Sequence, residues 1–376
     1  MAEKSTANAL ETCEGNNLVR DTARFDFTTL LSLSTAPRAF RFWLIAFICA
    51  LLATLITFYS IFTHLRRWVR PSEQKHVVRI LLLVPIYACI SWAGFYWYRD
   101  VVYFDVIEHV YEAVVIYSFL SLILVYLGEN INAQRLLLKD KAQMKYPFPF
   151  RFWTYDPTSA SFLLDIKVMI LQYVVVRPLL AVVAVVLQSH HKFCMESMAP
   201  TYGHFSFVVI NFISVTFALF GLLTLYMTVR HDVAHRKVTA KFLAIKAVIF
   251  LTFLQQTVLS LLAHKDVIPA LVYWTPFNIA SGSNAFLVCV EMALASIVHF
   301  KVFSVKEYDN ENLGLTVAGV PDAERATWPE TQHRIGAFTA LGQALNPMDI
   351  LRDVWSAMKY MGLWMKHGLK PEHWEK

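Results

Sequence analysis

Seven separate runs of apolar residues, each about 20 residues or longer, are the feature that most limits what this chain can fold into. A helix needs about that length to cross the hydrocarbon of a bilayer, and lipid offers no hydrogen-bond partners to a non-helical backbone. The composition agrees, because 56% of the 376 residues are hydrophobic and only 16% are charged. We therefore predict an all-α integral membrane protein with seven transmembrane helices. The predicted spans are 39–62, 78–98, 107–128, 162–188, 204–229, 242–263 and 279–303.

Lys and Arg are distributed unevenly among the connections between these spans. The connections after the first, third and fifth spans hold four or five each, whereas the alternate connections hold one each, Arg99, Lys192 and Lys265. Positive residues collect on the cytosolic side of membrane proteins, which places the N-terminus outside and the C-terminus in the cytosol. Arg38 and Arg41, at the outer end of the first span, run against this bias. The net charge of +6 forms a collar suited to an anionic inner leaflet, and it gives no case for nucleic acid as a partner.

The chain divides into three parts by composition. We predict an extracellular or lumenal tail over 1–38, the seven-helix domain over 39–305 and a cytosolic tail over 306–376. Within the last part, Asn346 is a good helix cap, Pro347 fits the first helical position and Asp349 suits the first turn. An amphipathic helix is therefore expected at about 347–367, either on the inner leaflet or packed under the bundle.

Ionisable and amide side chains inside the spans are candidates for function, because lipid does not tolerate them unless they face protein or a polar cavity. In the fourth span, Arg177 lies near the middle, followed by the helix-kinking Pro178, and Gln172 lies at mid-depth. Glu112 stands near the outer entry of the third span. Counting helical rise puts Arg177 and Glu291 at comparable depths, so an ion pair between them is expected if their helices adjoin. Packing and a substrate path are both open interpretations of these charges.

The sixth and seventh spans carry further polar residues on one side. Asn284, Glu291 and His299 lie within a third of the circumference of the seventh helix, and Lys246 shares a face of the sixth helix with Thr257, Ser260 and His264. Together with the first group they form the predicted substrate path. Its members are Glu112, Gln172, Arg177, Lys246, Gln255, Gln256, Asn284, Glu291 and His299.

The chain has five cysteines. Cys49, Cys89 and Cys289 lie inside spans, where they are expected to act as small apolar packing. Cys13 and Cys194 both fall on the predicted outer side, so either a disulfide between them or two free thiols fits the sequence.

Several strings resemble the organic solute transporter alpha-subunit family, which includes transmembrane protein 184 and Lazarus-type proteins of plants. The resemblance covers about 39–305 and the tail helix, and looks closest to the fungal or plant branch. The strings that carry it are "YFDVIEHVYEAVVIYSFLSLILVYLGEN", "LQYVVVRPLLAVVAVVLQ", "KFLAIKAVIFLTFLQQ", "NAFLVCVEMALASIVHF" and "ALNPMDILRD". It implies facilitated diffusion of amphipathic organic anions, such as bile acids or conjugated sterols, or of lipids, with no cofactor. It also implies that Glu112 pairs with a basic residue on a neighbouring helix. Action alone, as a homodimer or with a single-pass beta-like subunit all fit the sequence.

Two other functions are open from the sequence. A trafficking, vacuole or endosome lipid-homeostasis factor, or a receptor-like protein without transport, has the same seven-span layout. A seven-span zinc lipid hydrolase is the second, because His231 and His235 stand four residues apart, a spacing that seats zinc on a helix. Two histidines in a basic loop are more often solvated, so we expect no metal and no enzyme. Plasma, endosomal and vacuolar membranes all fit the sequence.

Overall fold

The structure of the protein is a computed structural model. It describes residues 37–97, 101–128, 130–147, 150–159, 161–190, 204–265, 267–268, 276–309 and 336–367.

All seven predicted spans are helices of transmembrane length and composition. They are α3 (Pro37–Arg66), α4 and α5 (Pro71–Leu81 and Leu83–Tyr96), α6 (Val101–Leu127), α8 (Phe162–Ser189), α9 (His204–Val229), α10 (Val238–His264) and α11 (Pro276–Val302). The predicted integral, multi-pass membrane protein is thus confirmed. The end where α3, α6, α9 and α11 finish, and where α4, α8 and α10 begin, carries the basic connections and is called the basic end below. That the basic end faces the cytosol stays a prediction.

The second span begins seven residues earlier than the sequence predicts, at Pro71 instead of position 78. The first turns of α4 are polar, but Glu73, Gln74 and His76 are buried by protein rather than exposed. Gln74 explains how the chain reverses there: its side chain accepts hydrogen bonds from the amides of Val69 and Arg70 and donates one to the carbonyl of Arg67. Hydropathy alone cannot find a helix end whose polar side chains are satisfied internally.

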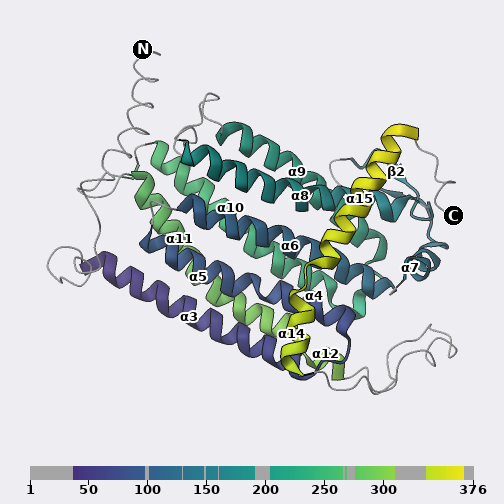
Figure 1. The fold of residues 1–376 in the computed structure, drawn as a ribbon, viewed down its shortest axis with the longest axis horizontal. Helices are drawn as coiled ribbons and strands as arrows, with labels where there is room; N and C mark the ends of the chain where they lie inside the picture. The colour runs from purple at the N-terminus through teal and green to yellow at the C-terminus, as the bar shows by residue number, and fades with distance from the viewer. Residues whose placement is uncertain are drawn as a thin grey trace, which may run out of the picture.

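The helices pack as two groups that meet at α6 (Figure 1). On one side α6 packs along α8, which in turn packs along α9. On the other side α11 packs along α3, α5 and α10, while α4 and α5 join this group to α6. The buried core follows these contacts, and the outward faces of α3, α8, α9 and α10 are apolar and exposed, as a bilayer requires.

Smaller elements connect the spans, or follow the last one, at the basic end. They are α7 (Ile131–Leu138), an antiparallel pair of strands, β1 (Met144–Lys145) and β2 (Thr154–Tyr155), η1 (Ala234–Arg236) and α12 (Lys306–Asp309). Gly128 ends α6 with φ +152°, a backbone conformation that favours glycine. A Cβ atom there would lie 2.8 Å from Cβ of Ala133, so the turn into α7 requires glycine for space as well.

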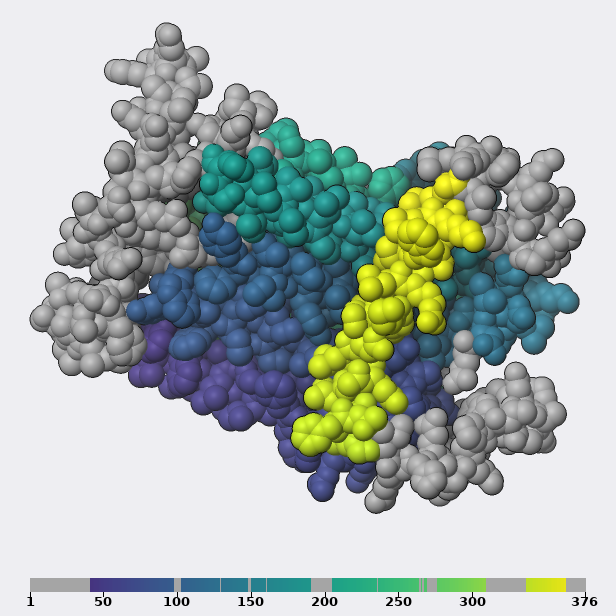
Figure 2. Space-filling view, viewed as in Figure 1, coloured from purple at the N-terminus to yellow at the C-terminus, as the bar shows by residue number. Residues whose placement is uncertain are grey.

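The tail forms two helices, α14 (Ala337–Leu345) and α15 (Met348–His367), which we call the tail strap. The sequence predicted α15 but not α14. At their junction Asn346 accepts a hydrogen bond from the amide of Met348 at 3.0 Å, as expected of its predicted place at the start of the helix. The strap crosses the side of the bundle, with α14 on α3 and α4 and α15 on α8 (Figures 1 and 2).

Candidate functional site

Glu112 and Arg177 meet between α6 and α8. Nη2 of Arg177 donates to Oε2 of Glu112 at 3.0 Å, and the hydroxyl of Tyr173 donates to Oε1 at 2.8 Å. A further bond runs from Nη2 of Arg177 to Nδ1 of His109 at 2.9 Å. Glu112 is 5% exposed, so the positive charge of Arg177 compensates a carboxylate charge that would otherwise be buried alone. The expected pairing of Glu112 with a basic residue on a neighbouring helix is confirmed.

The predicted partnership of Arg177 with Glu291 is wrong. Their depths are comparable, but α8 packs on α6 and α9, whereas α11 packs on α3, α5 and α10. Helical rise gives depth and says nothing about which helices are neighbours. Arg177, Lys246 and Glu291 therefore occupy two separate places instead of one common polar interior.

Gln172 joins α8 to α9. Its amide donates to the carbonyl of Ser214 at 2.7 Å, and the Ser214 hydroxyl donates back to Oε1 at 2.7 Å. Both hydrogen-bonding ends of the amide are thus used, because Nε2 also donates to the carbonyl of Met169 at 3.1 Å. A polar pair satisfied in this way holds two helices together in lipid.

The remaining predicted residues lie on α10 and α11, and four of them carry buried polar atoms for which the described chain supplies no hydrogen-bond partner. Nε2 of Gln255, Oδ1 of Asn284 and Oε2 of Glu291 are buried and have no hydrogen-bond partner within the described part of the chain. Gln255 is nine residues before the outer end of α10 and Asn284 eight after the outer start of α11, so both lie about 12–14 Å deep. Glu291 is seven residues, or about 10 Å, further along α11. We call Gln255, Asn284 and Glu291 the unsatisfied trio.

Three other predicted residues border or leave this region. Lys246 is half-buried on α10, with Nζ 5.8 Å from the ring centroid of Phe242. His299 is 1% exposed, and neither ring nitrogen has a hydrogen-bond partner that the described chain supplies. Gln256 is exposed, one position from the half-buried Gln255.

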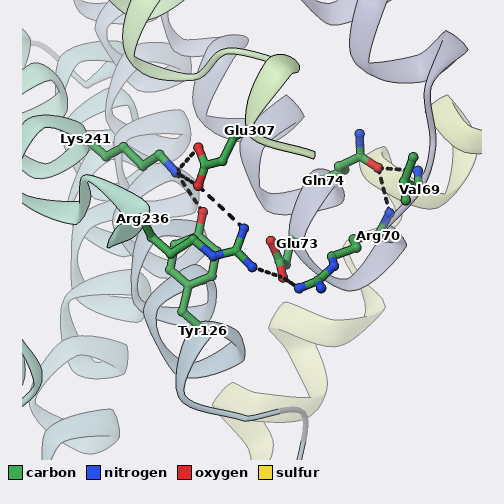
Figure 3. A network of polar contacts seen from close by, with 8 residues as sticks. All are labelled: Val69, Arg70, Glu73, Gln74, Tyr126, Arg236, Lys241 and Glu307. Carbon is green, nitrogen blue, oxygen red and sulfur yellow. Dashed lines mark hydrogen bonds and ion pairs between the residues drawn. The ribbon is translucent and has the colours of Figure 1, made fainter. Parts of the chain in front are cut away.

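A charge network at the basic end was missed by sequence reasoning (Figure 3). Nζ of Lys241, at the start of α10, donates to both carboxylate oxygens of Glu307 at 2.8 and 2.9 Å and to the hydroxyl of Tyr126 at 2.9 Å. Arg236 bridges Glu307 and Glu73, at 3.6 Å from each. The network ties α10, α12, α6 and α4 together. Lys241 lies just before the sixth predicted span and Glu307 beyond the last, so a search for charges inside the spans does not find either.

The cysteine and metal predictions have partial answers. Cys49, Cys89 and Cys289 are free thiols, whereas Cys13 and Cys194 lie outside the described residues. His231 lies beside Arg230, whose Nε donates to its Nε2 at 3.2 Å, and the side chain of His235 is not described. Among the side chains that are described, no three His, Cys, Asp or Glu residues are grouped to hold a metal ion.

Comparison with known proteins decides the family. The family model of the organic solute transporter Ostα matches residues 42–308, which is most of the chain and all seven spans. The chain belongs to this family. A transmembrane protein 184 homologue of Dictyostelium discoideum is 32% identical over 262 residues, which cover 69% of this chain and 51% of that protein. The chain thus spans about half the length of that relative. No solved structure matches the chain.

Proposed function

We propose that the protein is a membrane transporter of amphipathic organic solutes, sterol- or bile-acid-like anions or lipids, which it moves by facilitated diffusion. Membership of the Ostα family, a family of solute transporters, supports the class of function. The observation that carries the choice of site is the unsatisfied trio on α10 and α11. A buried polar atom without a partner costs about 1–3 kcal/mol, and lipid cannot supply the missing hydrogen bond. A polar solute can.

The surroundings of the trio suit a largely apolar ligand. α10 packs along α11 but only briefly on α6. It meets α9 near the basic end, where the hydroxyl oxygens of Tyr226 and Thr239 lie 2.6 Å apart. Apolar side chains cover most of the remaining surface of α10. A sterol body would lie along these walls, while its few polar groups bond to the trio.

The polar chemistry distinguishes two ends of such a ligand. The amides of Gln255 and Asn284 offer both donors and acceptors, and Glu291 accepts hydrogen bonds, as a sterol hydroxyl requires. Lys246 is the nearby cation on the same helix, about 14 Å from Gln255 along the axis, a separation that suits the acid head at the far end of the ligand. Glu112 and Arg177 neutralise each other, so in this proposal they hold α6 and α8 in place.

The test is uptake of a labelled bile acid or sterol sulfate by proteoliposomes. We expect saturable uptake by the wild type, and its loss in Gln255→Leu and Asn284→Leu, which replace unsatisfied amides with apolar groups and should not lower thermal stability. Gln256→Leu is the matched control, since its side chain is exposed, and it should transport normally. Normal uptake by both amide variants would overturn the site, and no uptake by the wild type would overturn transport and favour a trafficking factor.

The partner and the membrane belong to the same proposal. The exposed apolar faces of α9 and α10 are the surfaces on which a second copy or a single-pass beta-like subunit would pack in the membrane. Cross-linking in intact plasma, endosomal and vacuolar membranes, followed by mass determination, separates a monomer from either complex.

A further inference from the structure

We propose that the tail strap is an interfacial device that binds an anionic lipid surface, with its outer apolar face in the acyl chains and its basic edge on the headgroups. This inference concerns a surface remote from the unsatisfied trio and does not depend on transport.

The depth of the strap along the spans follows from the residues that bind it to the bundle. Arg79 lies eight residues inside α4, and Tyr117 ten residues inside α6 from its basic end, or about 12 and 15 Å along the helix axes. Arg79 bonds to Asp349, and the hydroxyl of Tyr117 donates to Asp353 at 3.0 Å. The first turns of α15 therefore lie beside the spans, short of their ends. A surface that points away from the bundle at this level meets the bilayer.

The far part of α15 rises toward the basic end. The hydroxyl of Tyr360 donates to Asp165 at 3.1 Å, and Asp165 stands in the first turn of α8. The strap thus runs obliquely from α4 to the start of α8, across the side of the bundle (Figure 2). The slope is therefore intermediate between that of a span and that of a helix in the interface plane, so the outer face of α15 extends from the level of the acyl chains to that of the headgroups.

The inner and outer sides of α15 have opposite chemistry. Ile350 and Tyr360 are buried against the bundle, and the acids Asp349 and Asp353 also face it through the bonds given above. The outer side is an apolar stripe repeated at helical spacing. It comprises Met348, Leu351, Trp355 and Met358, which are 57%, 58%, 69% and 44% exposed.

The basic edge lies next to this stripe. Arg352 and Lys359 are both exposed, seven residues apart on one side of α15, and both acids of the helix that the structure describes are already paired inward. An apolar stripe with an adjacent row of cations matches an anionic leaflet better than it matches a neutral one.

A second exposed aromatic group at the basic end supports lipid as the occupant. Phe152 and Trp153, in the turn between β1 and β2, are 71% and 59% exposed and follow Arg151. Aromatic rings flanked by cations gather where hydrocarbon meets headgroups. The strap and this turn are both near the start of α8, so one interface accommodates the two (Figure 1).

The experiment is site-directed spin labelling of the full chain, with native cysteines replaced, in vesicles of phosphatidylcholine alone or with phosphatidylserine. We expect labels at Leu351→Cys, Trp355→Cys and Met358→Cys to collide with oxygen several-fold more than with a nickel chelate. Labels at Arg352→Cys and Lys359→Cys should show the reverse preference, and a label at Ala357→Cys, on the half-buried side, should be immobile. Phosphatidylserine lies in both leaflets, so the protein's orientation does not affect the result.

Nickel accessibility at Leu351→Cys and Trp355→Cys equal to that at Lys359→Cys would overturn the proposal, since the stripe would then face water or a soluble partner. Binding of anionic headgroups has its own test, in which the depth of a label at Trp355→Cys is measured with Arg352 and Lys359 intact and again with Arg352→Gln and Lys359→Gln. Phosphatidylserine should shift the label deeper into the bilayer when both cations are intact, and should leave its depth unchanged when both are replaced. The same shift in both backgrounds, or in neither, would overturn recognition of anionic headgroups.

Discussion

Arg79→Met should release the tail strap from the bundle. The Arg79 side chain is 4% exposed and makes all four of its hydrogen bonds to the tail. Nε donates to the carbonyl of Ala344 at 2.6 Å and Nη2 to that of Asn346 at 2.7 Å. Two further bonds, each 2.9 Å, join its two terminal nitrogens to the two oxygens of Asp349. Methionine fills much of the same space and makes none of these bonds.

The size of the effect follows from how well each partner is shielded. A hydrogen bond to a charged group contributes about 1.5–3 kcal/mol, and breaking a fully buried ion pair costs about 3–5 kcal/mol. Asp349 is 26% exposed and keeps Lys75 at 3.3 Å, so part of its charge stays compensated after the change. We therefore expect docking of the strap to weaken by about 3 kcal/mol, which is roughly a hundredfold change in the docking equilibrium.

Hydrogen exchange read by mass spectrometry measures this directly. In Arg79→Met, amides of 337–361 should exchange up to about a hundredfold faster, while those of α5 and α11 keep their protection. Arg352→Met is the control, because Arg352 is exposed on the same strap, and it should leave exchange unchanged. Equal protection of the strap in the wild type and Arg79→Met would show that apolar packing alone holds it, and would refute the reasoning.

Three further predictions concern other contacts. Burial opposes ionisation of Asp349, but hydrogen bonds and positive charge from Arg79, with Lys75, outweigh it and hold its pKa below the usual value. A carboxyl group with a depressed pKa stabilises the folded state at pH values above its pKa in the unfolded chain, and this stabilisation is lost only in more acid solution. Hydrogen exchange of the strap should therefore be constant from about pH 5 to 8 after correction for intrinsic exchange rates, and release of the strap near pH 6 would contradict this. Gly128→Ala should destabilise the protein by about 1–3 kcal/mol in thermal unfolding, because of the positive φ and the 2.8 Å approach to Ala133, whereas Gly94→Ala, with open space around it, should not. Glu112→Ala should cost about 3–5 kcal/mol by leaving Arg177 uncompensated, and adding Arg177→Met should recover part of that loss; no recovery would mean that the pair is not coupled.

Most of the fold was predictable because every segment that crosses a bilayer must be a helix of about 20 predominantly apolar residues. All seven spans end within four residues of the predicted positions, and five also begin within four, since apolar length decides them. The two exceptions are the starts of α6, six residues early, and of α4, seven residues early, where the helix depends on buried contacts of Glu73 and Gln74 that hydropathy cannot detect. The site was less predictable for a related reason. Periodicity identified polar residues on a face, but the neighbours of each helix decided that Arg177 meets Glu112 and that Gln172 meets Ser214.

The state of each polar group in the structure bears on which of them a solute can use. To bind a ligand, Arg177 must first give up Glu112 and His109, and Lys241 must give up Glu307, at a cost of several kcal/mol for each buried pair. Gln255, Asn284 and Glu291 each have an atom with no bond to give up, so a ligand that reaches them gains its hydrogen bonds without that cost. Facilitated diffusion requires sites that solutes enter and leave readily, and this difference in cost favours α10 and α11 over the more highly charged interior between α6 and α8.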